Sequence, residues 1–545
     1  MRLIHTTTLQ LHEFVGSAIP PYAILSHTWQ DDEVSFQDMM SSPDVVMKPG
    51  YDKIFQTCRL AREQHIEFAW VDTCCIDKAS SAELTESINS MFAWYKKAVV
   101  CYAYLADLHS TSLALDLCSW FTRGWTLQEL LAPNRMYFYN MDWEHVGSKY
   151  DLASRITGTT GIPKPVILGQ VTLDSCSVAM RMSWAANRET TRVEDMAYSL
   201  LGIFGVHMPL IYGEGTAAFR RLQEEIIKRN NDLTIFAWDH TPYALAEQQT
   251  EQTVLPLLAK SPKAFSQSWL VVPFTDDFAE FSLTNKGLAS NVMLRIIHAN
   301  HSYPAASSDT LIYSLWLGSG VNQVPVGIGL RKIGPGFFHR DLRCPPMTTD
   351  KPIPEVDQIE NPSNYHILVD PPIHPTRLPF SNFRKNAIHV PRHPSFELLK
   401  VSPEHLWDVT DRVFLRPHPF EFSRYPMALA MQFRFDFRGL DYIFVVLCSY
   451  SSRDPKPTCV ITDDPIMEDT IFNDRNRQMS LSFQDLITQR HAIGSLSSHL
   501  KVNDWGAYRV FVSMREDEYD ISDPDTGPET RIRMFGVDLT LKSLA

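Results

Sequence analysis

Four short runs of consecutive apolar residues alternate with helix-type segments in the first part of the chain. The apolar runs cover residues 22–26, 68–72, 98–105 and 135–139. Between them, residues 53–65 and 84–95 carry apolar side chains at helical spacing. A run that is apolar on both faces is typical of a strand in a sheet that is covered on both sides. The alternation therefore predicts βαβ units, a parallel sheet and right-handed crossovers.

Polar residues follow two of these runs at the points where the strands would end. Ser26, His27 and Trp29 stand at the end of the first run, and Asp72 and Asp77 at the end of the second. In parallel α/β sheets, ligands bind outside the carboxyl ends of the strands. These five residues are therefore candidate binding residues. The alternative is that they are loop residues that cap helices or face water.

The segment RGWTLQELL, residues 123–131, has the pattern of the first turns of a helix after a glycine. Trp125 and Glu129 stand four residues apart, so a helix places them on one face. The order of the strands brings this segment to the same edge of the sheet. In apolar surroundings the pKa of Glu129 should be raised, because burial disfavours the charged carboxylate. The alternative is an amphipathic helix whose glutamate faces water.

Residues 182–238 are mainly helical by pattern, although residues 233–238 resemble an extended segment. Thr191 and Glu194 stand at the spacing of a capping box. We interpret Arg192, Glu194 and Asp195 as a structural ion-pair cluster rather than a site.

Short β-type runs dominate the chain beyond residues 239–252, a polar segment that we interpret as a linker. The runs cover residues 292–297, 311–317, 324–330, 365–369, 431–435, 442–447, 508–514 and 531–541. They predict one β-sandwich-like domain with long insertions. The expected organisation is an α/β domain at residues 1–150, a helical extension at 151–240 and a β-rich domain without an assigned role at 241–545.

Composition excludes several classes of protein. The formal net charge of −13 over 545 residues argues against nucleic acid as a partner, because binding phosphates needs clustered Lys and Arg. The longest apolar run, residues 442–450, is too short to span a membrane, and the start of the chain resembles no signal peptide. Nine cysteines without a CxxC pair indicate a reducing, cytoplasmic compartment and no metal site. P-loop, GxSxG and HExxH motifs are absent from the sequence.

Four motifs in order give the first half a resemblance to the fungal heterokaryon incompatibility (HET) domain family. They are residues 22–29 (YAILSHTW), 69–77 (AWVDTCCID), 123–130 (RGWTLQEL) and 191–204 (TRVEDMAYSLLGIF). The HET domain in turn resembles TIR domains, which implies a flavodoxin-like sheet. Many TIR domains cleave NAD with a glutamate in a Trp-Cys-x-x-Glu-Leu segment. Residues 125–130 are similar to that segment, with Thr126 in place of the cysteine.

The resemblance implies two functions of different classes. In the first, the chain is a vegetative incompatibility effector that causes programmed cell death in self/non-self recognition. Glu129 is then the catalytic carboxylate that cleaves NAD at the nicotinamide–ribose bond, with NAD as substrate and no bound cofactor. In the second, the HET domain is a non-catalytic signalling module. It then binds other HET or TIR-like domains, or a second copy of itself.

Overall fold

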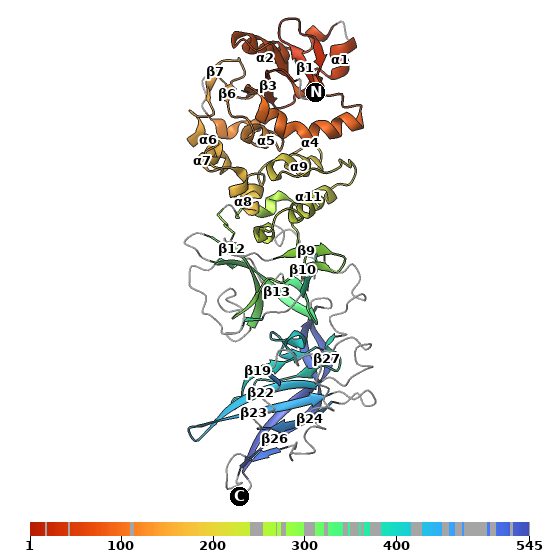
Figure 1. Cartoon of the computed structure of the whole chain (residues 1–545), viewed down its shortest axis with the longest axis vertical. Coiled ribbons are helices and arrows are strands. Elements are labelled where there is room, and N and C mark those ends of the chain that lie inside the picture. The colour runs from red at the N-terminus through yellow and green to blue at the C-terminus, as the bar shows by residue number, and fades with distance from the viewer. Residues whose placement is uncertain are drawn as a thin grey trace. The chain divides into compact units, whose positions relative to one another are not determined.

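The computed structural model describes the chain apart from residues 17–18, 42–43, 110–113, 240–253, 269, 274–279, 299–310, 321–324, 342–346, 349–358, 361–364, 371–382, 416–427, 450–456, 464–470, 473–498, 502–507, 524–526 and 544–545. The chain divides into two compact units, whose elements are labelled in Figure 1. Unit 1 comprises Met1–Pro242, Leu258–Asp276 and Leu317–Gln323; unit 2 comprises Tyr243–Leu257, Asp277–Trp316 and Val324–Ala545. Except for Asp239, the predicted linker lies outside the described residues.

The sheet of unit 1 has the order β2-β1-β4-β3-β5-β6-β7. Its strands are β1 (Arg2–His5), β2 (Leu11–Glu13), β3 (Tyr22–His27), β4 (Phe68–Trp70), β5 (Val100–Tyr104), β6 (Met136–Tyr139) and β7 (His145–Ser148). β3 is parallel to both β4 and β5, and β5 is parallel to β6. The four predicted strands and their parallel pairing are thus confirmed. Antiparallel strands, which we did not predict, extend the sheet at both edges.

The strand order reverses direction at β3. The chain passes from β3 to β4 on one side and then crosses to β5 on the other side. In doubly wound sheets such a reversal opens a crevice at the carboxyl ends of the two strands that flank it, here β3 and β5. All six residues of β3 are buried, which agrees with its apolar sequence and central position.

Helices cover both faces of this sheet, as Figure 1 shows for α2 on one face and for α4 and α5 on the other. The helices of this part are α1 (Phe36–Ser41), α2 (Tyr51–Glu63), α3 (Asp72–Cys75), α4 (Ser81–Lys97) and α5 (Thr126–Leu131), with the 3₁₀ helices η1 (Val45–Met47), η2 (Leu115–Leu117) and η3 (Ser119–Phe121). The Ser80 hydroxyl caps the start of α4, because it accepts a hydrogen bond from the Glu83 amide.

The rest of unit 1 is mainly helical, as predicted. It contains α6 (Ala153–Thr160), α7 (Lys164–Ile167), η4 (Leu173–Ser175), α8 (Val178–Ser183), α9 (Asp195–Tyr198), α10 (Leu201–Phe204), α11 (Ala217–Ile227), η5 (Leu233–Phe236) and η6 (Pro262–Phe265). The expected extended segment at residues 233–238 is wrong over its first four residues. They form η5 because the Asp232 side chain caps the turn by accepting from the Thr234 amide at 2.9 Å.

The capping box at Thr191 and Glu194 is not formed. Glu194 is itself the N-cap residue of α9 and makes no side-chain cap. Its carboxylate instead accepts hydrogen bonds from the amides of Gly213 and Gly215, at 2.8 and 3.0 Å. The neighbouring Asp195 accepts a hydrogen bond from the Tyr212 hydroxyl at 2.9 Å. These acidic residues are therefore structural, as interpreted, but they hold the turn at residues 212–215 by hydrogen bonds.

Unit 2 is rich in β-structure, as predicted, and all eight predicted runs contain strands. Its elements are β8 (Val254–Leu255), β9 (Phe281–Thr284), β10 (Gly287–Ser290), β11 (Leu294–His298), β12 (Leu311–Ser319), β13 (Pro325–Gly334), β14 (Phe337–Asp341), β15 (Met347–Thr348), β16 (Ile359–Glu360), β17 (Tyr365–Ile367), β18 (Ile388–His389), β19 (Glu397–Ser402), η9 (Glu404–Leu406), β20 (Trp407–Asp408), β21 (Val413–Phe414), β22 (Ala428–Phe437), β23 (Leu440–Ser449), β24 (Thr458–Thr462), β25 (His499–Lys501), β26 (Tyr508–Asp523) and β27 (Gly527–Ser543).

The strands of unit 2 form three sheets among the described residues, where the sandwich prediction expected two. The largest has the order β16-β11-β12-β13-β14-β17-β10-β9, with β15 beside β13 and β8 beside β14. The second has the order β20-β21-β18-β27-β26-β25, and the third β19-β22-β23-β24. Local turns determine where the long hairpins form. In the hairpin of β22 and β23, for example, Gly439 adopts a φ of 81° in the turn between the strands. The pairing of distant strands such as β18 and β27 leaves no such local signal.

Candidate active site

A buried hydrogen-bonded chain joins β3 to α5. The Ser26 hydroxyl, at the end of β3, donates to Oε2 of Glu129 at 2.5 Å. The indole N–H of Trp120 donates to the same Ser26 oxygen at 2.9 Å. Ser26 and Trp120 are fully buried, and the Glu129 residue is 7% exposed. The candidate residues Ser26 and Glu129 are thus in direct contact at the carboxyl end of a central strand.

Glu129 holds its proton unusually tightly. Burial raises the pKa of Glu129 to about 8, and the negative charge of Asp72 acts in the same direction. The hydrogen bond from Ser26 and the contact with Tyr95 oppose this shift. The upward direction agrees with the sequence-based expectation, which did not foresee the opposing contact with Tyr95. At neutral pH the carboxyl group is mainly protonated, with an ionised fraction that grows towards pH 8.

A second cluster surrounds Asp72, the first residue of α3. Nε2 of His27 lies 3.0 Å from one carboxylate oxygen of Asp72, and the Trp29 indole N–H donates to the other at 2.8 Å. Although burial raises the pKa of Asp72, these hydrogen bonds and the adjacent cations lower it to about 2. Asp72 is therefore ionised where Glu129 keeps its proton, so the two carboxyl groups have opposite protonation preferences.

Charged residues extend this second cluster. Nδ1 of His27 lies 3.8 Å from Glu33, which pairs with the buried Lys53 ammonium of α2. Lys53 also donates to the carbonyl of Thr28 at 3.2 Å, and this contact fixes the loop after β3. The Lys78 ammonium lies 3.5 Å from the centre of the Trp29 ring. Exposed aromatic surface with a cation on its face is thus available beside the strand end.

The two clusters lie on different sides of the end of β3. Successive side chains of a strand point to opposite faces, so Ser26 turns towards α5 and His27 towards α2 and α3. The order of the strands in the sequence predicted that all these residues lie at one edge of the sheet. It could not show that Ser26 and His27 point to opposite faces. The clusters remain close enough for the Asp72 charge to raise the pKa of Glu129.

Two of the predicted site residues, Asp77 and Trp125, have contacts outside these two clusters. Asp77 accepts hydrogen bonds from the Gln37 side chain at 2.7 Å and the Ala79 amide at 3.0 Å, so it organises the turn before α4. The Trp125 indole interacts with Asp195 of α9, which ties the start of α5 to the helical extension. For Asp77, this is the structural role in a loop beside a helix that the alternative interpretation offered.

A second set of contacts fixes the segment before α5. The Thr126 hydroxyl donates to the Trp120 and Arg123 carbonyls. It accepts from the buried guanidinium of Arg188 at 3.0 Å, and Arg188 also donates to the Arg123 carbonyl at 2.7 Å. Thr126 therefore has a positioning role here that a thiol would fill poorly, because a thiol is a weak donor and a weak acceptor. Arg188 carried no signal in the sequence that pointed to α5.

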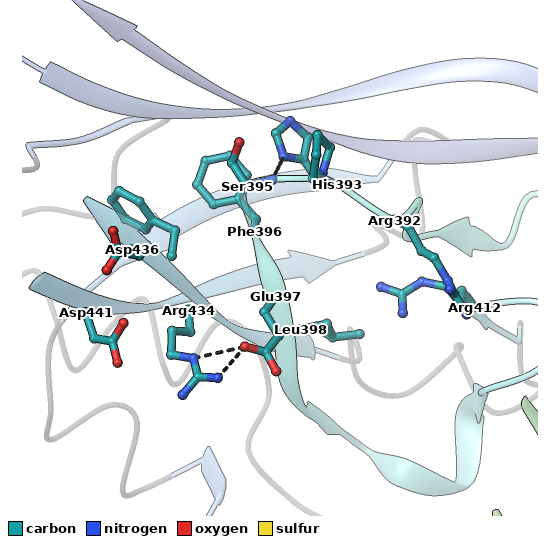
Figure 2. Close-up of a pocket in the computed structure, with 12 residues that line it drawn as sticks. Arg392, His393, Ser395, Phe396, Glu397, Leu398, Arg412, Arg434, Asp436 and Asp441 are labelled. Carbon is teal, nitrogen blue, oxygen red and sulfur yellow. Dashed lines mark hydrogen bonds and ion pairs between the residues drawn. The ribbon is translucent and has the colours of Figure 1, made fainter. Parts of the chain in front are cut away.

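A cavity of about 820 Å³ lies in unit 2 beside β19 and β22 (Figure 2). Arg392 and Arg412 lie next to each other at one end, and Arg434 pairs with Glu397 near the middle. The carboxylates Asp436 and Asp441 lie on the opposite side. None of the residues predicted from the sequence lines this cavity. Within the described parts of the chain, no group of three or more potential metal ligands is found, and no helix is long and apolar enough to cross a membrane.

The comparisons with known proteins assign the N-terminal part to a class. The heterokaryon incompatibility protein (HET) family matches residues 22–119, and a domain of unknown function, DUF8212, matches residues 217–306. Residues 22–119 therefore form a HET domain, which contains β3, β4 and β5 with the helices between them.

One curated protein is similar to this chain over a longer stretch than the HET match. The vegetative incompatibility protein HET-E-1 of Podospora anserina is 49% identical over 223 residues, which are 38% of this chain and 16% of that protein. The chain thus spans only a small part of the length of this relative. No solved structure was found to match the chain.

Proposed function

We propose that this protein is a vegetative incompatibility effector that causes programmed cell death on contact between unlike fungal strains. The HET domain and the name of the Podospora anserina relative support this role. Its partners are then other HET or TIR-like domain proteins, or a second copy of the chain. The cysteine pattern supports a cytoplasmic location.

The proposed activity is cleavage of NAD at the nicotinamide–ribose bond, with Glu129 as the catalytic carboxylate. One observation carries this proposal: Glu129 is a buried carboxyl group with a raised pKa, bonded to Ser26 where the strand order reverses. The parallel strands follow the order β4-β3-β5-β6, which is the order of flavodoxin-like sheets and supports a TIR-like fold.

Cleavage of an N-glycosidic bond develops positive oxocarbenium charge on the ribose, which a nearby carboxylate stabilises. Nicotinamide leaves as a neutral molecule, so no strong general acid is needed. The ionised form of Glu129 is then the active one, and Ser26 orients it through the bond to Oε2. Trp29 and Lys78 supply a ring surface and a cation for other parts of the dinucleotide. Asp72 and His27 hold the Trp29 indole in place.

The burial of Glu129 favours a second candidate function. At 7% exposure the residue offers little surface to a substrate, so catalysis requires the segments that cover Glu129 to move. A HET domain that stays closed would act instead by association. Exposed apolar side chains on and beside α1, such as Met40 and Met47, offer a surface for that role.

Expression of variants in fungal cells separates the two functions. Glu129→Gln removes the carboxylate while keeping its shape, and Met40→Asp with Met47→Asp alters the exposed surface only. Loss of killing and of NAD depletion with Glu129→Gln, but not with the double surface variant, supports NAD cleavage. Killing that survives Glu129→Gln and is lost with the surface variant supports the association role.

A further inference from the structure

A cavity of about 320 Å³ lies within unit 1, between the segment 188–196 and α11. Its walls include the apolar side chains of Val193, Met196 and Phe219, together with Arg188 and Lys260. The one carboxylate among its lining residues, Glu189, belongs to an exposed residue. The volume is at the lower end of the range of small-molecule sites, which combine apolar walls with a few polar groups.

Arg188 is the unusual residue of this cavity. It is 5% exposed, and its guanidinium is held by three neutral acceptors. Nη1 donates to the Arg123 carbonyl and to the Thr126 hydroxyl, and Nε donates to the Trp184 carbonyl at 3.3 Å. The remaining nitrogen, Nη2, is buried and has no hydrogen-bond partner among the described residues. A buried donor without an acceptor is costly, and such a group marks a place where a partner is missing.

The charge of Arg188 is also poorly balanced. No carboxylate among the described residues forms an ion pair with it, and burial lowers its pKa to about 9. The carboxyl group that favours its charged form is Glu129, which is mainly protonated at neutral pH. A buried cation without a counter-ion destabilises a protein. A bound anion would act as the counter-ion and so remove this destabilisation.

We propose that this cavity binds a small organic anion whose carboxylate or phosphate accepts hydrogen bonds from Arg188 and whose apolar body contacts Val193, Met196 and Phe219. A guanidinium presents several donors in one plane and suits both oxyanions. Lys260 lines the same cavity and carries a second positive charge. The ligand would contact the same side chain that fixes Thr126 and Arg123 before α5. The proposal does not depend on NAD cleavage.

Calorimetric titration of the purified full chain tests this site. The probes are benzoate, phenyl phosphate and inorganic phosphate, with neutral benzamide as the matched control. We expect benzoate or phenyl phosphate to bind at least about tenfold more tightly than benzamide, a difference of about 1.4 kcal/mol. Comparison of benzoate with phenyl phosphate identifies the preferred oxyanion. Absence of binding by every anion, or equal binding of benzamide, overturns the proposal.

Two variants locate the binding. Arg188→Gln removes the charge, and Val193→Trp narrows the cavity at an exposed position without touching the hydrogen bonds of Arg188. Each should weaken the binding of the anion at least about tenfold, while Arg220→Gln on the outer face of α11 should leave it unchanged. If Arg188→Gln fails to fold, the affinity of Val193→Trp for the anion is the deciding measurement. Unchanged affinity in the folded variants overturns the proposal.

Discussion

The Ser26 hydroxyl donates to Oε2 of Glu129 across 2.5 Å and thereby joins the end of β3 to α5. The two residues are 103 positions apart in the chain. Ser26 also accepts the indole N–H of Trp120, so its single hydroxyl satisfies one buried donor and one buried acceptor. This one contact links the strand end, the helix and the proposed catalytic group.

Loss of the Ser26 hydroxyl should therefore destabilise unit 1. Ser26→Ala leaves the Trp120 N–H buried without an acceptor, which should lower the free energy of unfolding by about 1–3 kcal/mol. Urea unfolding followed by tryptophan fluorescence measures the change. In the double variant with Trp120→Phe the orphaned donor is gone, so the cost of Ser26→Ala should shrink. Equal costs of Ser26→Ala in both backgrounds would contradict the hydrogen-bonded arrangement.

The raised pKa of Glu129 should make unit 1 less stable as pH rises. Between the ordinary glutamate pKa of 4.5 and the folded value of about 8, the unfolded chain has lost a proton that the folded chain keeps. Stability from this group is thus full below about pH 4.5 and falls as pH rises towards 8. Glu129→Gln mimics the protonated acid and should remove that part of the slope, roughly 3–5 kcal/mol over the range. Calorimetric scans at a series of pH values test this. Identical pH profiles of the variant and the wild type would refute the assignment.

Asp72 should act in the opposite direction. Its pKa of about 2 lies below the ordinary value of 3.8, so its stabilising effect is present above pH 3.8 and is lost as pH falls towards 2. Asp72→Asn should lower the free energy of unfolding at neutral pH by about 1–3 kcal/mol, because His27 and Trp29 lose a charged acceptor. Removal of the Asp72 charge should also lower the pKa of Glu129. The stability profile attributed to Glu129 should therefore move to lower pH, and a profile that stays in place contradicts their coupling.

Much of unit 1 could be predicted because its signals are local. The apolar runs of β3, β4, β5 and β6 each report a buried strand, and alternation with helices fixes their parallel pairing. The contacts of Trp120 and Arg188 could not be predicted, because each depends on which distant segment packs against it. Likewise, Glu194 has the spacing of a capping box, but the amides of Gly213 and Gly215 compete for its carboxylate. For the predicted site, the strand order correctly identified the edge of the sheet. It could not show to which face of the sheet each side chain turns.

Close packing at Gly124 gives a further prediction. A Cβ at this position would lie 2.4 Å from Cγ2 of Thr190, on the segment that pairs with it through the Gly124 amide and the Glu189 carbonyl. Gly124→Ala should therefore cost about 1–3 kcal/mol of stability. Thr190→Ser deletes the clashing methyl group and should restore most of the loss in the double variant, as measured by urea unfolding. No rescue by Thr190→Ser would show that the clash is not the cause.

The most direct test of the account is the release of nicotinamide from NAD by the purified full chain, as monomer and in its associated form. The wild-type protein should release nicotinamide, faster as pH rises towards 8 because more Glu129 is ionised. Glu129→Gln should lower the rate at least about 100-fold, whereas Glu225→Gln, on the surface of α11, should not change it. Equal release by Glu129→Gln and wild type, or no release by the wild-type protein in either form, would contradict the account.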